Sequence, residues 1–164
     1  TREEQRGFRV ATVSKDELRE LIDTRCWMEE IALRKSIENT HTEWEENLVL
    51  AYHRLSRVPR SVKEGTFERN PEWDDLHHGF HMALISACGS RWLIGFCKQL
   101  NDQADRYRCL SSISQPNRNT MEEHRSIMEA SINGDADTAV AELHNHFRRT
   151  EDIILQSDFD FVAD

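Results

Sequence analysis

Residues 70–89 read NPEWDDLHHGFHMALISACG, and this stretch decides the fold class. Asn70 is a good helix cap, Pro71 suits the first helical position, and acidic residues fill the first turn. The apolar residues that follow recur at helical spacing: Trp73, Leu76, Phe80, Ala83 and Leu84. Gly89 is typical of the position just after a helix end. The stretch therefore predicts a helix with one apolar face.

Two more helices are predicted before this stretch. Ser14 and Glu17 form a capping box that opens a helix of about 25 residues. Its inward face carries Leu18, Leu21, Ile22, Arg25, Met28 and Ala32. Thr42 with Glu45 opens the second helix, which ends before Pro59.

Three further helices are predicted after it. A fourth helix carries Leu93 and Tyr107 and is broken by residues 111–119, and a fifth covers roughly 120–133. Asp135 caps a sixth, which runs to about residue 156. No segment of useful length alternates polar and apolar residues as a strand does. The fold class is therefore all-α, an antiparallel bundle of about six to seven helices.

Composition limits the possible partners. The chain has 164 residues, which suits one domain. Lys and Arg number 21 and Asp and Glu 30, so the formal net charge is −9. Because binding to DNA backbones or anionic lipid depends on positive charge, we expect no membrane binding and no bulk electrostatic DNA binding by this segment. No run approaches the roughly 20 apolar residues of a membrane span.

Four cysteines stand at positions 26, 88, 97 and 109, without a CxxC pair. This spacing argues against a zinc ribbon or a thioredoxin-type site. We interpret them as reduced, mostly buried small hydrophobes, which favours a cytoplasmic location.

Eight histidines are many for this length, and four of them accompany apolar residues. His77 and His81 are one helical turn apart on one face, which allows both imidazoles to reach one metal ion. His124 and His146 lie on the fifth and sixth helices, beside Ile127, Leu143 and Phe147. Two interpretations stay open: a divalent metal site, or partly exposed histidines that are hydrogen-bonded. Protons are expected to compete for such a site near the ordinary histidine pKa of about 6.5.

The other four histidines, His41, His53, His78 and His144, are predicted to lie at the surface. His144 points away from His146 around the helix, so both cannot face one site.

An enzyme is the alternative interpretation: a small helical-bundle metalloenzyme with a His-rich site. A di-iron carboxylate bundle needs two Glu-x-x-His motifs, whereas this chain has one Asp-x-x-His, from Asp74 to His77. Neither a Gly-x-Ser-x-Gly elbow nor a glycine-rich phosphate loop occurs. We therefore predict no catalytic residues and no enzymatic activity.

Three ordered motifs resemble the FadR-type C-terminal (FCD) ligand-binding domain of GntR-family transcription regulators. Residues 80–90 (FHMALISACGS) resemble its "FHxAL" signature, and EHRSI at 123–127, with Gly134-Asp135 and His146, is similar to its "EHxxI…GD…H" pattern. LREL at 18–21, with Arg25 and Glu29, resembles its first helix.

The resemblance implies a domain layout. Gly7–Ala11 is similar to the last strand of the winged-helix DNA-binding domain that precedes such domains. We therefore expect residues 1–13 to be its end plus a linker, 14–157 to be the metal- and effector-binding domain, and 158–164 to be a tail. The resemblance further implies a homodimer that controls operator binding by an N-terminal winged helix-turn-helix, so that DNA is bound only through that domain.

The resemblance also implies a metal site of one Asp and three His. Carried over to this sequence, the histidine ligands are His81, His124 and His146, and the Asp position holds His77. Either His77 ligates, or Asp74 reaches in from one turn earlier. We favour His77, because imidazole is a good zinc or nickel ligand, and these are the expected metals.

Regulators of this kind bind small carboxylates over the metal, so the expected effector is a small carboxylate. Arg25, among apolar residues of the first helix, is the predicted second anchor, since a guanidinium pairs bidentately with a carboxylate. A structurally paired arginine is the alternative interpretation. Arg106 is a weaker candidate anchor, as is Arg108.

Overall fold

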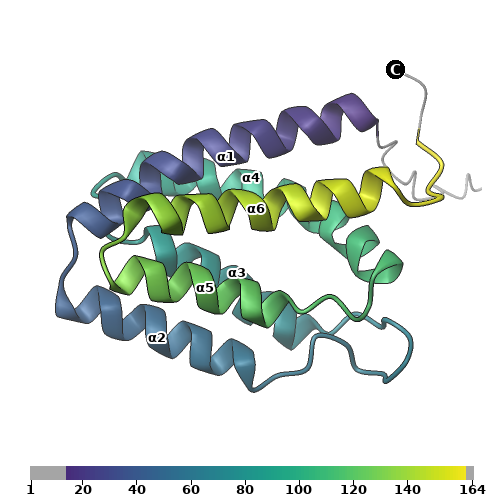
Figure 1. The fold of residues 1–164 in the computed structure, drawn as a ribbon, viewed down its shortest axis with the longest axis horizontal. Helices are drawn as coiled ribbons and strands as arrows, with labels where there is room; N and C mark the ends of the chain where they lie inside the picture. The colour runs from purple at the N-terminus through teal and green to yellow at the C-terminus, as the bar shows by residue number, and fades with distance from the viewer. Residues whose placement is uncertain (1–13, 162–164) are drawn as a thin grey trace, which may run out of the picture.

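The computed structural model describes residues 14–161, which form an all-α bundle (Figure 1). The helices are α1 (Lys15–Glu38), α2 (Thr42–Ser56), α3 (Pro71–Ile85), α4 (Arg91–Ser114), α5 (Thr120–Ile132) and α6 (Ala136–Leu155). The predicted fold class and the six predicted helices are confirmed. The expected strand at 7–11 lies outside the described residues.

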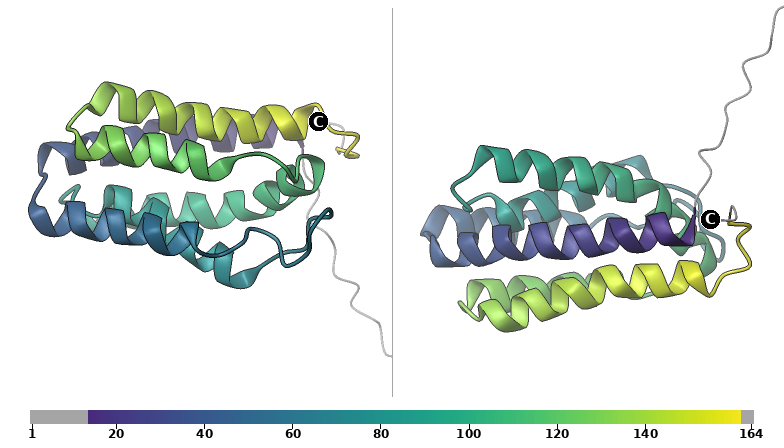
Figure 2. Two further views of the ribbon diagram at one scale, coloured as in Figure 1. Left: turned by 60° about the horizontal axis from the view of Figure 1, so that its bottom comes forward. Right: turned by 90° about the horizontal axis from the view of Figure 1, so that it is seen from above.

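The helices pack with long axes roughly aligned, and neighbours in space are often distant in sequence. α1 lies beside α6, and α5 packs against α6 on its other side (Figure 1). α4 contacts both α1 and α6, while α2 packs against α3 and α5. Seen from above, α1 lies between α4 and α6 (Figure 2). This packing brings α3, α4, α5 and α6 around one interior region.

Helix boundaries follow the predicted caps with two differences. The side chains of Ser14, Asn70 and Asp135 accept backbone N–H bonds at the starts of α1, α3 and α6. α2 is capped by His41 instead of Thr42, because Nδ1 of His41 accepts the N–H of Trp44 at 2.9 Å.

α4 runs about one turn past its predicted break at residue 111 and ends at Ser114. The hydroxyl groups of Ser112 and Ser114 donate to carbonyl oxygens four residues earlier, at 3.0 Å each. Serine side chains bonded in this way are compatible with a helix, which explains why this serine-rich stretch does not end it. At the other boundary, α3 stops at Ile85, and Gly89 turns the chain toward α4 with a φ of +83°.

The core consists of large apolar side chains from all six helices, with Leu18, Trp44, Leu48, Phe80 and Leu143 almost fully buried. None of the four cysteines forms a disulfide, and Cys26, Cys88 and Cys97 are buried, as predicted. Burial raises the pKa of the Cys26 thiol to about 11 and that of Cys97 to about 12.

Two features concern the ends and the surface of the described chain. Phe159 and Phe161, in the expected tail, are half-buried and pack against the core. Among residues 14–161, no helix is both long and apolar enough to cross a membrane.

Candidate metal centre

Four imidazoles meet in the interior of the bundle. His77 and His81 come from α3, His124 from α5 and His146 from α6. One ring nitrogen from each lies within 4.8 Å of those of the others, and all four side chains are buried. The structure thus brings together the four histidines that the sequence singled out, and the set offers four nitrogen ligands to one ion.

These histidines are neutral in the folded chain. Burial, followed by nearby positive charges, lowers the pKa of His77, His81 and His124 well below 6.5, and burial also lowers that of His146. Each neutral ring keeps one lone pair for a metal or a hydrogen bond. In the metal-free chain, proton uptake by these rings is therefore shifted below pH 6.5, and the expected pH dependence of metal binding stays a prediction.

His124 is the least satisfied member of the cluster. Its side chain is 0% exposed, and neither ring nitrogen has a hydrogen-bond partner. Phe80 lies against it with ring centroids 5.0 Å apart, so its surroundings are partly apolar. An imidazole in such a place is costly unless a ligand occupies at least one of its nitrogens.

His146 has the partner that a metal-binding histidine needs. Its Nδ1 lies 2.7 Å from the carboxylate of Glu123, which also forms a two-pronged ion pair with Arg118. Burial alone would raise the pKa of Glu123, but hydrogen bonds from His146 and Arg118 bring it down to about 2. Because the carboxylate is ionised, Nδ1 of His146 donates, and the lone pair on Nε2 is left for the cluster.

His77 has a different kind of partner. Its ring stacks on Trp73 with centroids 4.6 Å apart, and its Nδ1 lies 2.9 Å from Nη1 of Arg108. Its Nε2 lies 3.2 Å from Nε2 of His81. Asp74, the alternative fourth ligand, instead forms ion pairs with Arg69 and Arg108 and is not a member of the cluster.

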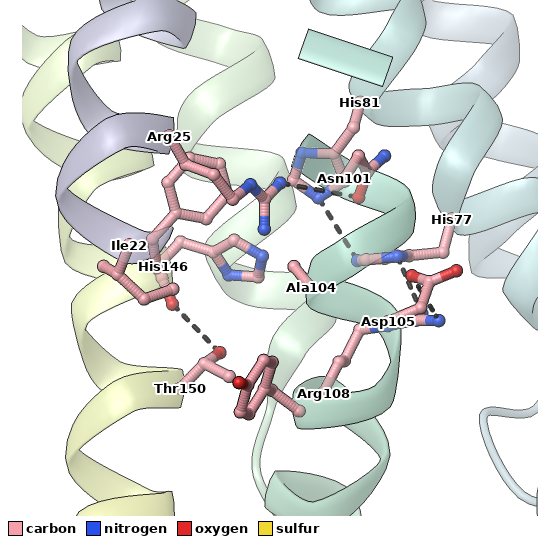
Figure 3. Close-up of a pocket in the computed structure, with 12 residues that line it drawn as sticks. Ile22, Arg25, His77, His81, Asn101, Ala104, Asp105, Arg108, His146 and Thr150 are labelled. Carbon is pink, nitrogen blue, oxygen red and sulfur yellow. Dashed lines mark hydrogen bonds and ion pairs between the residues drawn. The ribbon is translucent and has the colours of Figure 1, made fainter. Parts of the chain in front are cut away.

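A small cavity of about 20 Å³ lies beside the imidazoles (Figure 3). Arg25 and Arg108 line it from opposite sides, with Asn101 and Thr150 between them. A single water molecule needs about 10–15 Å³ of cavity volume, so in this conformation the cavity has room for little more than one water molecule.

Arg25 is held firmly at the cavity wall. Its guanidinium pairs with the buried carboxylate of Glu29 at 3.0 Å and lies over the Phe147 ring, 3.9 Å from the centroid. Burial raises the pKa of Glu29, and the ion pair with Arg25 opposes that rise. The predicted anchor is thus also a structurally paired arginine, so the two interpretations of Arg25 are compatible.

The remaining predicted residues lie elsewhere. Arg106 donates to the hydroxyl of Tyr107 at 3.3 Å and approaches Glu17, outside this cavity. His41 and His53 are exposed, whereas His78 and His144 are half-buried and hydrogen-bonded, so their predicted surface location is only partly right.

Three residues at the site were missed or underrated: Glu123, Asn101 and Arg108. Glu123 adjoins His124 in sequence yet serves His146 on another helix, a contact that depends on tertiary packing. The helical spacing of Asn101, Ala104 and Arg108 on α4 puts them on one face, and this spacing is the sequence signal that α4 contributes to the site.

Comparison with known proteins places this site in a family. Residues 20–149 match the family described as the FCD domain. The HTH-type transcriptional regulator BphR of Paraburkholderia xenovorans (strain LB400) is 36% identical over 153 residues, which are 93% of this chain and 62% of BphR. The HTH-type transcriptional repressor GlaR of Escherichia coli (strain K12) is 35% identical over 104 residues, which are 63% of this chain and 46% of GlaR. The chain thus spans about half to two-thirds of these relatives.

Two solved structures have the same fold. The metal-free FCD domain of TM0439 superposes with a TM-score of 0.68 at 24% identity and covers 88% of this chain and 96% of that one. The Zn2+-bound FCD domain of TM0439 gives a TM-score of 0.64 at 24% identity, with 87% and 94% covered.

The family and the named relatives are those of transcription regulators and not of enzymes, which argues against the metalloenzyme alternative. The match covers most of the chain and includes all four clustered histidines. This chain belongs to the FCD domain family.

Proposed function

We propose that this chain is the effector-sensing and dimerisation domain of a GntR-type transcription regulator, and that it binds a small carboxylate over a divalent metal ion. The observation that supports this best is the fully buried His124, which has no hydrogen-bond partner while three other imidazoles surround it. An unsatisfied buried polar group costs about 1–3 kcal/mol. A metal ion would occupy one nitrogen of His124 and one nitrogen of each of the other three rings at the same time.

The proposed ligands are His77, His81, His124 and His146, with zinc or nickel as the metal. A set of neutral imidazoles suits both ions. The zinc in the related FCD structure supports zinc. Asp74 is the weaker choice for fourth ligand, because two arginines already neutralise its carboxylate.

The proposed effector is a small carboxylate. When bound, the metal supplies a positive charge that attracts a carboxylate oxygen, and four neutral imidazoles do not offset that charge. Arg25 is the proposed second anchor, since it lines the cavity beside the cluster. The small cavity volume implies that side chains must move to admit the effector. Arg106, outside this cavity, could reach the anion only after such a movement.

Operator binding is proposed to belong to a winged helix-turn-helix of the full-length regulator, as the names of the HTH-type relatives suggest. The net charge of −9 makes this chain itself a poor DNA ligand. Its four unpaired thiols suit a cytoplasmic protein.

A homodimer is proposed to form through α1 and α4. Trp27 and Ile31 on α1 are 65% and 52% exposed, and Trp92 and Phe96 on α4 are 80% and 50% exposed. Each pair is one turn apart, and the two helices pack against each other (Figure 2). Exposed large apolar side chains on two neighbouring helices are typical of interfaces.

Zinc titration of chelator-treated protein tests the metal proposal. Calorimetry should give one ion per chain, and His124→Ala should lose binding because it removes a ligand from the cluster. His53→Ala is the matched control, since His53 is exposed and is not a member of the cluster, and should bind like the wild type. Undiminished zinc binding by folded His124→Ala protein would contradict the proposal.

A further inference from the structure

The contact between Arg108 and His77 fixes the position of a proton. Nη1 of Arg108 lies 2.9 Å from Nδ1 of His77. A guanidinium has only donors, so Nδ1 of His77 must accept this hydrogen bond. In a neutral imidazole the other nitrogen then carries the hydrogen, which puts His77 in the Nε2–H tautomer.

This tautomer places a hydrogen on the nitrogen that faces the cluster. Nε2 of His77 lies 3.2 Å from Nε2 of His81 and donates to it, so neither nitrogen offers a free lone pair to a ligand. Nδ1 of His81 then carries the hydrogen on that ring, and it has no partner. If both residues held an ion through Nε2, each Nε2 would need its lone pair, so the bond between them would have to open and the hydrogen on Nε2 of His77 would have to move to Nδ1 by exchange with solvent.

We propose that Arg108 restrains metal binding by holding His77 in the tautomer that cannot ligate through Nε2. This inference rests on the proposed metal site. When His77 binds a metal through Nε2, its Nδ1 carries the hydrogen and faces a guanidinium that cannot accept it. Arg108 must then release His77 and keep only its two carboxylate partners, Asp74 at 3.2 Å and Asp105 at 3.1 Å.

The two outer partners of the cluster therefore have opposite effects. Glu123 accepts a hydrogen bond from Nδ1 of His146, which leaves the lone pair on Nε2 of that ring free for a metal. Arg108 donates a hydrogen bond to Nδ1 of His77, which puts the hydrogen of that ring on Nε2. Arg108 is thus a positioning residue: it touches His77 and acts on the metal through it.

Metal affinity tests this role. Arg108→Gln supplies an amide oxygen that can accept from Nδ1–H of His77, and outer partners of this kind typically change metal affinity by about 10–100-fold. We expect Arg108→Gln to bind zinc at least about tenfold more tightly than the wild type. Arg91→Gln, which alters an exposed arginine at the start of the same helix, should leave zinc affinity unchanged.

Removing a positive charge could also tighten zinc binding without any effect on His77. Arg60→Gln separates the two causes, because it removes a positive charge that also lowers the pKa of His124, whereas the hydrogen bond of Arg60 goes to Ser112 and not to His77. Arg60→Gln should tighten zinc binding much less than Arg108→Gln does. An equal gain in the two variants, or no gain from Arg108→Gln, overturns the proposal.

The tautomer itself can be read without any metal. Nitrogen-15 NMR of the histidine rings in the presence of a chelator should show His77 as Nε2–H in the wild type and as Nδ1–H in Arg108→Gln. A wild-type His77 in the Nδ1–H form overturns the proposal even if zinc binds as proposed. Conversely, failure of every variant to bind zinc contradicts the proposed metal site, and the NMR result still decides the tautomer.

Discussion

At the residue scale, burying four imidazoles close together costs free energy on folding, because their ring nitrogens leave water without finding a full set of partners. All four are buried, and their rings lie within reach of one another, yet they share one direct hydrogen bond between His77 and His81. Neutral imidazoles avoid the cost of buried charge, but the nitrogens of His124 remain unsatisfied. A protein that needed only a stable core at this place would be better served by apolar side chains.

Glu123 is the residue whose role a conservative change tests most directly. Glu123→Gln keeps the shape of the side chain but removes the charge that holds Nδ1–H of His146 and pairs with Arg118. Zinc affinity measured by calorimetry should fall by about 10–100-fold, the usual effect of losing such a partner.

The neighbouring Glu122→Gln is the control for this change. Glu122 is half-exposed and pairs with Arg125 at the surface, so its replacement should leave zinc affinity unchanged. Equal losses in the two variants would mean that Glu123 acts only through the overall charge.

Sequence reasoning found the histidines but missed their partners, for a physical reason. His77 and His81 are related by helical spacing, a local property, and His124 and His146 belong to short motifs. Arg108 reaches His77 across 31 positions and Glu123 reaches His146 across 23, and these contacts depend on how four helices pack.

At the element scale, α3 is the helix on which the site depends, because it carries two of the four imidazoles. Its first turn is fixed by Asn70, whose side chain accepts the N–H of Glu72 and donates to the carbonyl of Pro59. These two bonds also tie the preceding loop to the start of the helix.

Asn70→Ala should lower the free energy of unfolding by about 1 kcal/mol, the usual cost of losing a helix cap. Urea unfolding followed by circular dichroism measures this change. Asn117→Ala, at an exposed position in the turn before α5, is the control and should be close to neutral. A neutral Asn70→Ala would show that Pro71 and the packing of Trp73 fix the helix start without the cap.

The starts of α1, α3 and α6 were predictable from their caps, whereas the end of α4 and the cap of α2 were not. The predicted break at residue 111 rested on the polar character of 111–119, yet two serines there satisfy their hydroxyl groups within the helix. His41 caps α2 with a ring nitrogen, which the usual preference for Ser, Thr, Asp or Asn does not anticipate.

At the scale of the whole molecule, the buried histidines make stability depend on pH. Their pKa values are lowered in the folded chain, so the unfolded chain takes up more protons as the pH falls below 6.5. Without metal, the free energy of unfolding should therefore decrease on acidification, by up to about 1.4 kcal/mol per pH unit for each buried histidine. Above about pH 7 these groups contribute no pH dependence.

Urea unfolding in chelator between pH 7.5 and 5.5 measures this slope. His124→Leu removes one of the four groups, so the number of protons taken up on unfolding should fall by up to about one and the slope should become shallower. His53→Leu should not change the slope. Glu123, with a pKa near 2, adds a second loss of stability only as the pH falls below about 4.5. Stability that is flat or rises between pH 7.5 and 5.5 would contradict the burial of neutral histidines.

The last whole-molecule property is assembly, and here the exposed faces of α1 and α4 make a definite prediction. A regulator that binds two half-sites needs two-fold symmetry, and a symmetric contact uses the same surface patch on both chains. Trp92 is the most exposed of the four large apolar side chains on this surface, at 80%. Burying it in an interface would remove more apolar area from water than burying any of the other three.

Light scattering should give the wild type twice the chain mass of 19.2 kDa and Trp92→Asp a single chain mass at micromolar concentrations. A carboxylate at this position would be buried without a partner in the dimer, so the dissociation constant should rise by a large factor. Ile113→Asp is the matched control: Ile113 is 61% exposed on the same helix but lies about six turns along from Trp92, near the end of α4, and should leave the dimer intact. A wild type that stays at one chain mass would contradict the proposed dimer, and equal dissociation by both variants would place the interface elsewhere on α4.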